Sequence, residues 1–219
     1  MSNLIALEGP PFGGKTTLGR RLQDDGYRHV PELVAYVSPL TELPAENPRW
    51  STAAADTWYL HQEWRRWKAV CELAARQKVC ADRTPLTVVT YWLTRWRLLG
   101  VSPARETVTA CARALNSLDG TTVHFLVPDL DELCRRVRQH EASPDGPVER
   151  GRTGPFRWHR SKEFLSTNRE SYVALRDLLC RGGHGRYPEA LRGTAARSVS
   201  SGRVGALLRE IPGCEEWWT

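Results

Sequence analysis

A lysine and two threonines end a glycine-rich turn near the start of the chain. The residues from Gly9 to Thr17 read GPPFGGKTT, which fits the phosphate-binding pattern G-x-x-x-x-G-K-[ST]. The glycines of such a loop let backbone N–H groups curl around phosphate oxygens, and the following helix adds positive charge at its N-terminus. We expect Lys15 to reach the β- and γ-phosphates and the Thr16 hydroxyl to hold Mg²⁺. The predicted nucleotide-binding residues of the loop are Gly9, Phe12, Gly13, Gly14, Lys15, Thr16 and Thr17.

The segments on either side of this turn have the character that a phosphate loop needs. The apolar run 3–7 has the length of a strand, and 17–22 places leucines four residues apart, as a helix requires. A glycine-rich turn can match a loose pattern by chance, but a complete match between a strand and a helix is rare. We therefore interpret the turn as a triphosphate cradle and not as a structural turn.

Two acids are predicted at the ends of further strands. Glu32 follows the short β-like run 28–30, and Asp82 with Arg83 follows the run 78–81. Ligands of open α/β sheets bind at the carboxyl ends of the strands. Asp82 can order Mg²⁺ waters or accept a proton from an attacking hydroxyl, and Arg83 can hold substrate oxygens. The plainer alternatives are a solvated loop glutamate and a surface ion pair.

A long helical pattern runs from Thr52 to Gln77, with Ser51 as its predicted N-cap. It carries a stripe of aromatic, amide and basic side chains at spacings of three and four. This stripe consists of Trp58, His61, Gln62, Arg65 and Arg66. It is either a wall that faces the substrate, with Trp58 and Gln62 as contacts, or part of an ordinary amphipathic helix with snorkelling arginines.

Arginines also gather in a segment from about 140 to 160 that is rich in Pro and Gly and lacks apolar periodicity. They are Arg150, Arg152, Arg157 and Arg160. This composition is typical of a mobile lid that brings arginines to a reacting group, and we expect Arg152 to be catalytic. A disordered basic loop without a catalytic role is the alternative.

The remaining patterns complete an alternation of helices and strands. Helices are predicted over 86–99, 104–118, 130–139, 162–179 and 204–211, a further strand of the parallel sheet over 121–127, and a weaker strand over 194–199. The sequence contains no internal repeat or long linker. A single α/β domain over residues 1–219 is therefore expected.

The bulk composition limits the classes of partner. The net charge is +6, but the Lys and Arg residues are spread along the chain and no nucleic-acid motif is present, so an anionic small molecule is expected rather than nucleic acid. The six cysteines form no C-x-x-C pair, which argues against a zinc site or a disulfide framework. No apolar run reaches membrane-spanning length, and we expect a soluble, cytoplasmic protein without a membrane partner.

Four motifs in order resemble the nucleoside and nucleoside-monophosphate kinases of the P-loop superfamily, in particular the thymidylate kinase and deoxynucleoside kinase branch. Glu8 through Thr17 resembles the opening E-G-x-x-x-x-G-K-T-T, Pro31-Glu32 the Pro-Glu of the second strand, and Asp82-Arg83-Thr84 the D-R-x signature. The helix 162–179 carries Phe164, Arg169 and Tyr172, which resemble the pattern F-x-x-x-x-R-x-x-Y.

The resemblance implies a P-loop kinase fold, in which helices flank a five-stranded parallel sheet and an arginine-rich lid closes over the transferred group. It implies ATP with Mg²⁺ as the phosphoryl donor. Glu32 would match the acid beside the accepting hydroxyl, Asp82 the acid on the magnesium side, and Arg83 the arginine that grips the acceptor.

The resemblance also implies roles for residues outside these four motifs. Gln62 lies on the helix from which this branch presents a base-recognising glutamine. Arg135, Arg136 and Arg138 lead into the lid as the arginines of the family do, and Arg136 and Arg138 are expected to bind the nucleotide. A homodimer is among the assemblies that the sequence leaves open.

Pro11 departs from the family pattern. Thymidylate kinases usually place an acid inside the loop near the acceptor sugar, and a proline side chain can neither donate nor accept there. The sequence therefore favours a kinase that phosphorylates a hydroxyl or monophosphate of some other nucleoside-like acceptor. An antibiotic or natural-product O-phosphotransferase is the nearest alternative, and a nucleotide-binding regulatory switch without a phosphoryl acceptor is the alternative of another class.

Overall fold

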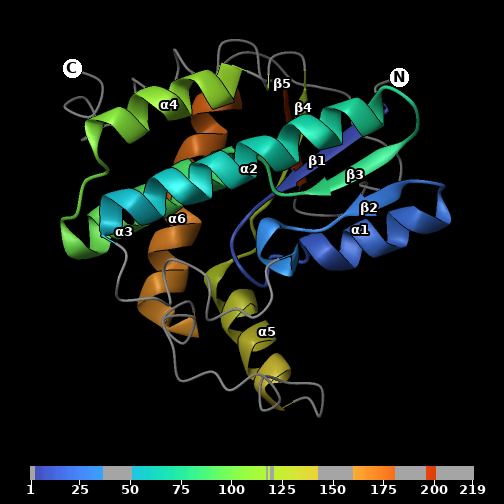
Figure 1. The fold of residues 1–219 in the computed structure, drawn as a ribbon. Coiled ribbons are helices and arrows are strands. Elements are labelled where there is room, and N and C mark those ends of the chain that lie inside the picture. The colour runs from blue at the N-terminus through green and yellow to red at the C-terminus, as the bar shows by residue number, and fades with distance from the viewer. Residues whose placement is uncertain are drawn as a thin grey trace.

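The computed structural model describes residues 3–36, 51–116, 118, 121–142, 160–180 and 196–200. Its strands form one sheet in the order β2-β3-β1-β4-β5 (Figure 1). The bounds of the strands are β1 Leu4–Glu8, β2 Arg28–Val30, β3 Val79–Asp82, β4 Thr122–Leu126 and β5 Ala196–Ser200. The strands β2, β3, β1 and β4 run parallel, so the loops that follow them all emerge at the same edge of the sheet.

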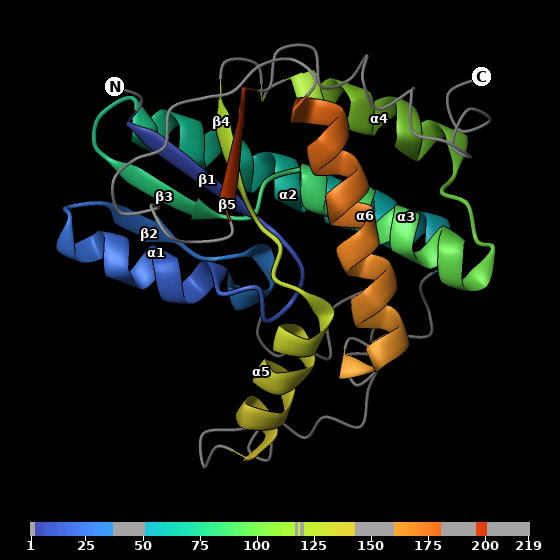
Figure 2. The ribbon, with the colours of Figure 1, turned by 180° about the vertical axis from the view of Figure 1, so that it is seen from behind.

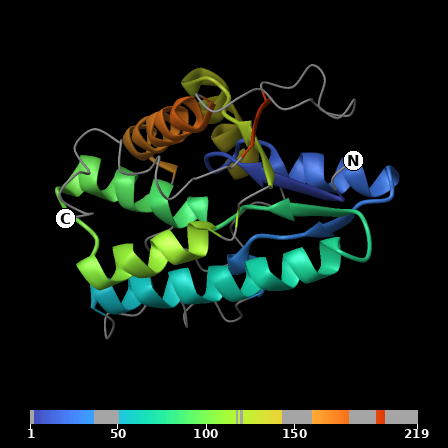
Figure 3. The ribbon, with the colours of Figure 1, turned by 90° about the horizontal axis from the view of Figure 1, so that it is seen from above.

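Helices connect the parallel strands and cover both faces of the sheet. Their bounds are α1 Lys15–Asp24, α2 Thr52–Ala74, α3 Leu86–Leu99, α4 Arg105–Asn116, α5 Leu130–Ala142 and α6 Lys162–Cys180, with a 3₁₀ turn η1 at Leu33–Tyr36. α2 and α4 run side by side (Figure 3). In the view from behind, α5 continues from the end of β4 and lies next to one end of α6 (Figure 2).

The alternation of side chains along β1 explains the two layers of core. Leu4 and Ala6 pack with residues of α2, α3, α4 and α6 on one face of the sheet. Ile5 and Leu7 pack on the opposite face against Leu18 and other residues of α1. All five residues of β1 are buried. A strand that is apolar on both faces is what a parallel sheet between two helical layers requires.

The expected α/β fold is confirmed, with one correction to the sheet. β5 pairs antiparallel to β4, so the sheet has four parallel strands and one antiparallel strand at its edge. The residue pattern of a strand carries no direction, and the segment 181–195 before β5 is long enough for the chain to enter the sheet from either end.

Several expected segments lie outside the described residues. They include the lid between 143 and 159, with Arg150, Arg152 and Arg157, and the helix predicted over 204–211. The single domain over 1–219 therefore stays a prediction. Within the described ranges, no helix combines the length and the apolar character that a membrane crossing needs.

Candidate active site

The glycine-rich loop connects the end of β1 to the start of α1. A Cβ atom on Gly9 would lie 2.1 Å from the carbonyl oxygen of Leu126, and one on Gly13 would lie 2.9 Å from that of Pro10. Gly14 adopts a left-handed conformation with φ of 94°. The N–H groups of the first turn of a helix point out of its N-terminus, and no described side chain caps α1 at Gly14, so this end of the helix has the character of an anion site.

Lys15 is buried inside this loop. Its Nζ donates hydrogen bonds to the carbonyl oxygens of Gly9, at 2.9 Å, and of Pro10, at 2.8 Å. Burial, together with the neighbouring Arg83 guanidinium, lowers the pKa of Lys15 to about 8, although nearby carboxylates oppose the shift. A phosphate group would supply a full negative charge where two carbonyl dipoles now hold the ammonium.

Thr16 and Asp82 lie together, as the sequence predicts for a magnesium site. The Thr16 Oγ1 donates a hydrogen bond of 2.7 Å to Asp82 Oδ2. The other carboxylate oxygen, Oδ1, is buried and has no hydrogen-bond partner among the described residues. No cluster of three or more His, Cys, Asp or Glu residues that could hold a metal alone occurs in the described part of the chain. One hydroxyl and one carboxylate fit Mg²⁺, which keeps several waters and shares its coordination with phosphates.

Glu32 and Arg83 form an ion pair at the ends of the neighbouring strands β2 and β3. The Arg83 Nε donates to Glu32 Oε2, and the side chains are 15% and 35% exposed for Arg83 and Glu32. Burial alone would raise the pKa of Glu32, but the charges of Arg83 and Lys15 outweigh burial and lower it. Glu32 is therefore a carboxylate that faces solvent in part and is held in place by a buried guanidinium.

The backbone at Arg83 is left-handed, with φ of 73°. A residue with a side chain adopts this conformation only when its surroundings hold it there. Arg83 Nη1 donates to Thr87 Oγ1, at 2.7 Å, and to the Tyr172 hydroxyl, at 3.0 Å. These contacts from α3 and α6 aim the guanidinium back toward the phosphate loop.

Glu8 is a site residue whose role sequence reasoning missed. Its Oε1 accepts hydrogen bonds of 2.6 Å from both the backbone N–H and the hydroxyl of Thr84, and its Oε2 accepts one of 3.2 Å from Tyr172. Burial raises the pKa of Glu8 to about 7 against the opposing effects of Arg83 and of the bonds from Thr84. An acid that ends an otherwise apolar strand was the signal available in the sequence.

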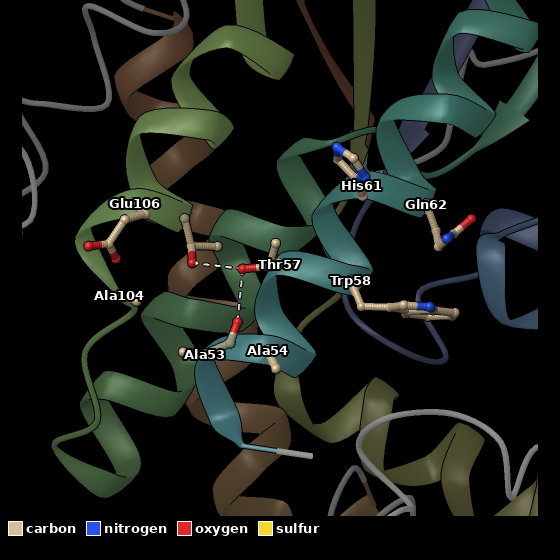
Figure 4. A pocket seen from close by; sticks show the side chains of 9 residues that line it. Ala53, Ala54, Thr57, Trp58, His61, Gln62, Ala104 and Glu106 are labelled. Atoms are coloured by element: carbon tan, nitrogen blue, oxygen red, sulfur yellow. Dashed lines mark hydrogen bonds between the residues drawn. The ribbon is translucent and has the colours of Figure 1, made fainter.

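The structure divides the predicted stripe on α2. Trp58, His61 and Gln62 line an open pocket of about 450 Å³ between α2 and α4 (Figure 4). In Figure 4 the side chains of Trp58 and Gln62 point away from Glu106. Arg66 instead faces the ends of β2 and β3. The substrate contacts of Trp58 and Gln62 stay predictions.

The arginines before the predicted lid differ in their contacts. Arg136 Nη1 donates to the carbonyl oxygen of Phe12 in the loop, at 3.1 Å, and its Nε donates to Glu132. Phe12 has φ of 61°, and its ring centroid lies 5.6 Å from that of His140 on α5. The structure therefore brings Arg136 to the loop. Arg138 and Thr17 are exposed, and no described contact tests their predicted role in nucleotide binding.

The helix α6 contributes two of the three motif residues to the strand ends. Tyr172 contacts Glu8 and Arg83, and Arg169 Nε donates to the carbonyl oxygen of Pro128 at the end of β4, at 2.8 Å. Phe164 is buried. α6 therefore braces the loops beyond β1, β3 and β4. Arg152, the predicted catalytic residue of the lid, lies outside the described residues.

A family model described as an AAA domain matches residues 4–150 of the chain. No curated protein sequence matches the chain.

Solved structures with a similar fold include deoxyadenosine kinase from M. mycoides with bound dATP, at 15% identity and a TM-score of 0.55, over 80% of this chain and 84% of that one. Thymidylate kinase from Candida albicans is similar over 99% of this chain and 93% of its own, at 14% identity and a TM-score of 0.53. At these identities the likeness confirms the resemblance in fold.

Proposed function

The chain belongs to the AAA domain family, and we propose that it is a kinase that transfers the γ-phosphoryl group of ATP, with Mg²⁺, to a nucleoside-like small molecule. One observation carries this proposal. The phosphate loop with Lys15 and Thr16, the acid Asp82 and the pair Glu32–Arg83 all lie at the carboxyl ends of three adjacent strands. A switch that only hydrolyses ATP would not need the acid–arginine pair Glu32–Arg83.

The donor half of the site, which consists of the phosphate loop with Lys15 and Thr16 together with Asp82, would neutralise charge on the phosphates. Lys15 would exchange its bonds to the loop carbonyls for bonds to the phosphates and would stabilise the charge that the transferring group carries. Thr16 and Asp82 are the residues that would hold Mg²⁺, directly or through water. Bound Mg²⁺ supplies further neutralisation of the phosphate oxygens.

The acceptor half of the site, which consists of Glu32 and Arg83, would position the oxygen that receives the phosphoryl group. Glu32 would accept a hydrogen bond from the acceptor hydroxyl and take its proton as the new P–O bond forms. Because Arg83 and Lys15 lower its pKa, Glu32 is a weak base. The loose transition state of phosphoryl transfer asks more for orientation than for strong proton abstraction, so a fixed weak base suffices.

The charges around Glu32 favour a hydroxyl over a monophosphate as the acceptor. Of the described arginines next to Glu32, Arg83 is paired with Glu32 itself and Arg66 with Glu63. A phosphate dianion brought into this half would face two carboxylates whose charges balance these arginines. A neutral hydroxyl needs no additional cation there. We therefore propose a neutral nucleoside-like acceptor, with a monophosphate as the less favoured one.

Mass spectrometry tests the proposed function. The purified protein is incubated with ATP and Mg²⁺ and with separate pools of nucleosides, nucleoside monophosphates and hydroxylated natural products, with Lys15→Ala as the control. The expected result is a product one phosphate heavier in the nucleoside pool, absent with the control. Phosphorylation of natural products alone would support the antibiotic-type alternative, and ATP consumption without any phosphorylated product would support a switch.

A further inference from the structure

A buried ion pair on α2 lies directly behind the acceptor half of the site. The side chains of Arg66 and Glu63 are only 7% and 2% exposed. The Arg66 Nε donates to both carboxylate oxygens of Glu63, at 3.2 and 3.0 Å, and Nη2 donates to Oε1 as well. Burial opposes the charge of the guanidinium, but the adjacent Glu63 carboxylate raises the pKa of Arg66, so it stays ionised.

The same guanidinium joins two loops that are far apart in the sequence. Arg66 Nη1 donates a bond of 3.1 Å to the carbonyl oxygen of Pro31, and Nη2 donates one of 2.6 Å to the carbonyl oxygen of Arg83. Pro31 immediately precedes Glu32. The two groups that form the acceptor half are therefore connected through their backbones by one side chain.

These contacts leave Arg66 little capacity to bind a substrate itself. A guanidinium has five N–H groups in a fixed fork, and the bonds to Glu63, Pro31 and Arg83 engage four of them. The planar fork also explains why the residue is an arginine. A lysine carries one ammonium group and cannot reach the carboxylate and both carbonyl oxygens with the same geometry.

We propose that Arg66, oriented by Glu63, is a positioning residue that fixes Glu32 and Arg83 relative to each other. The backbone of Arg83 needs such support because its left-handed conformation persists only where the surroundings hold it. The catalytic consequence rests on the proposed function. Since a misplacement of about 1 Å can lower a rate about 100-fold, loosening these loops should lower kcat by about that factor.

The test compares Arg66→Lys and Glu63→Gln with a matched control in another buried ion pair that involves α2. Asp56 of α2 forms a buried two-bond pair with Arg95 of α3, at 2.9 and 2.6 Å, and no contact recorded for Arg95 reaches the loops at 31–32 or 83–84. Arg95→Lys therefore loosens a comparable buried pair at another place. All three substitutions keep the size of the side chain similar, and both Lys variants keep the positive charge.

The first measurement is hydrogen–deuterium exchange of the whole protein, and it does not depend on activity. Arg66→Lys and Glu63→Gln should speed exchange in peptides covering 31–36 and 83–86 by tenfold or more, with β1 and β4 unchanged. Arg95→Lys should leave these peptides as in the wild type. Unchanged exchange in both loops, or a uniform increase throughout the chain, would overturn the inference.

The second measurement is the phosphorylation of 2′-deoxyadenosine and 2′-deoxycytidine. Arg66→Lys should lower kcat about 100-fold with little change in the KM for ATP, and should lower it much less in a Glu32→Gln background, because placing Glu32 is part of how Arg66 acts. Equal losses in both backgrounds would overturn the positioning role.

If Arg66→Lys fails to fold, Glu63→Gln decides both measurements in the same way. If the wild-type protein phosphorylates none of the compounds offered, the proposed function fails, while exchange at the two loops still decides whether Arg66 holds them.

Discussion

The two halves of the candidate site are built in different ways. In the donor half, Lys15 bonds to the carbonyls of Gly9 and Pro10, six and five residues away, and the shape of the loop depends on its glycine backbone. In the acceptor half, Glu32 and Arg83 are separated by 51 residues and are held by side chains from other elements. The phosphate loop of the donor half is mainly a local structure, whereas the acceptor half exists only when the sheet and helices are packed.

This difference predicts two signatures for substitutions. A change in the donor half should remove chemistry and leave the free energy of unfolding almost unchanged, because the loop does not support the rest of the fold. A change in the acceptor half should lower both activity and stability, because it breaks contacts between distant elements. The following variants test that contrast.

Lys15→Ala should have the largest effect on transfer. Loss of the ammonium removes a main source of charge stabilisation, and we expect a decrease in kcat/KM of about 10³-fold. The melting temperature should stay the same or rise, since burial lowers the pKa of Lys15 and the folded state holds this charge at a disadvantage. Steady-state kinetics and thermal unfolding give the two quantities. A large loss of stability would show that the loop is not an independent unit.

Glu32→Gln should lower kcat by about 10²-fold, because a neutral amide orients an acceptor hydroxyl poorly and cannot take its proton. Unlike Lys15→Ala, it should also destabilise the protein, by about 1 kcal/mol, because Arg83 loses its ionic partner. The affinity for ATP, measured by calorimetry, should not change. An unaltered kcat would remove Glu32 from the acceptor role.

The contrast also explains how much of the site could be predicted from the sequence. The glycine spacing of the loop and the strand endings at Glu32 and Asp82 are local patterns, and each was identified correctly in position. Thr16 and Asp82 are 66 residues apart, yet their proximity followed from placing both at the same edge of a parallel sheet. Topology supplied that contact without any knowledge of side-chain packing.

The supporting contacts could not be predicted in this way. The spacing of Arg66 on its helix groups it with Trp58 and Gln62, but its contact with Pro31 depends on how α2 docks on the sheet. Glu8 was visible as an acid at the end of β1, but its partner Tyr172 lies 164 residues away on α6. Such pairings depend on the angle and depth at which helices pack, which a single sequence pattern does not encode.

The affinity for ATP should depend moderately on pH, because the donor half contains the titrating group Lys15. The pKa of Lys15 in the free protein is lowered to about 8, and bound phosphates favour the charged ammonium. ATP binding should therefore take up a proton above pH 8, and its affinity should fall about tenfold between pH 7 and pH 9. Titration calorimetry in buffers of different ionisation enthalpy measures both quantities.

Lys15→Arg is the control for this pH effect, because a guanidinium keeps its charge throughout the range. Its affinity for ATP should be nearly constant from pH 7 to pH 9. The same decline in both proteins would assign the titration to another group, with Glu8 as the first candidate because burial raises its pKa to about 7.

The smallest predicted effect concerns Arg136 of α5, whose side chain contacts the loop backbone of the donor half. Arg136→Gln removes the bond from Nη1 to the Phe12 carbonyl, and since a single exposed or half-buried hydrogen bond contributes little, the KM for ATP should rise only about threefold. Arg135→Gln is the matched control, because Arg135 shares the partner Glu132 but bonds to it alone among the contacts recorded for it. Arg135→Gln should leave the KM unchanged. An equal rise of the KM in both variants would attribute the effect to Glu132 and α5. A hundredfold rise of the KM for Arg136→Gln would mean that the donor half, too, depends on a distant helix. The contrast between the two halves would then be wrong.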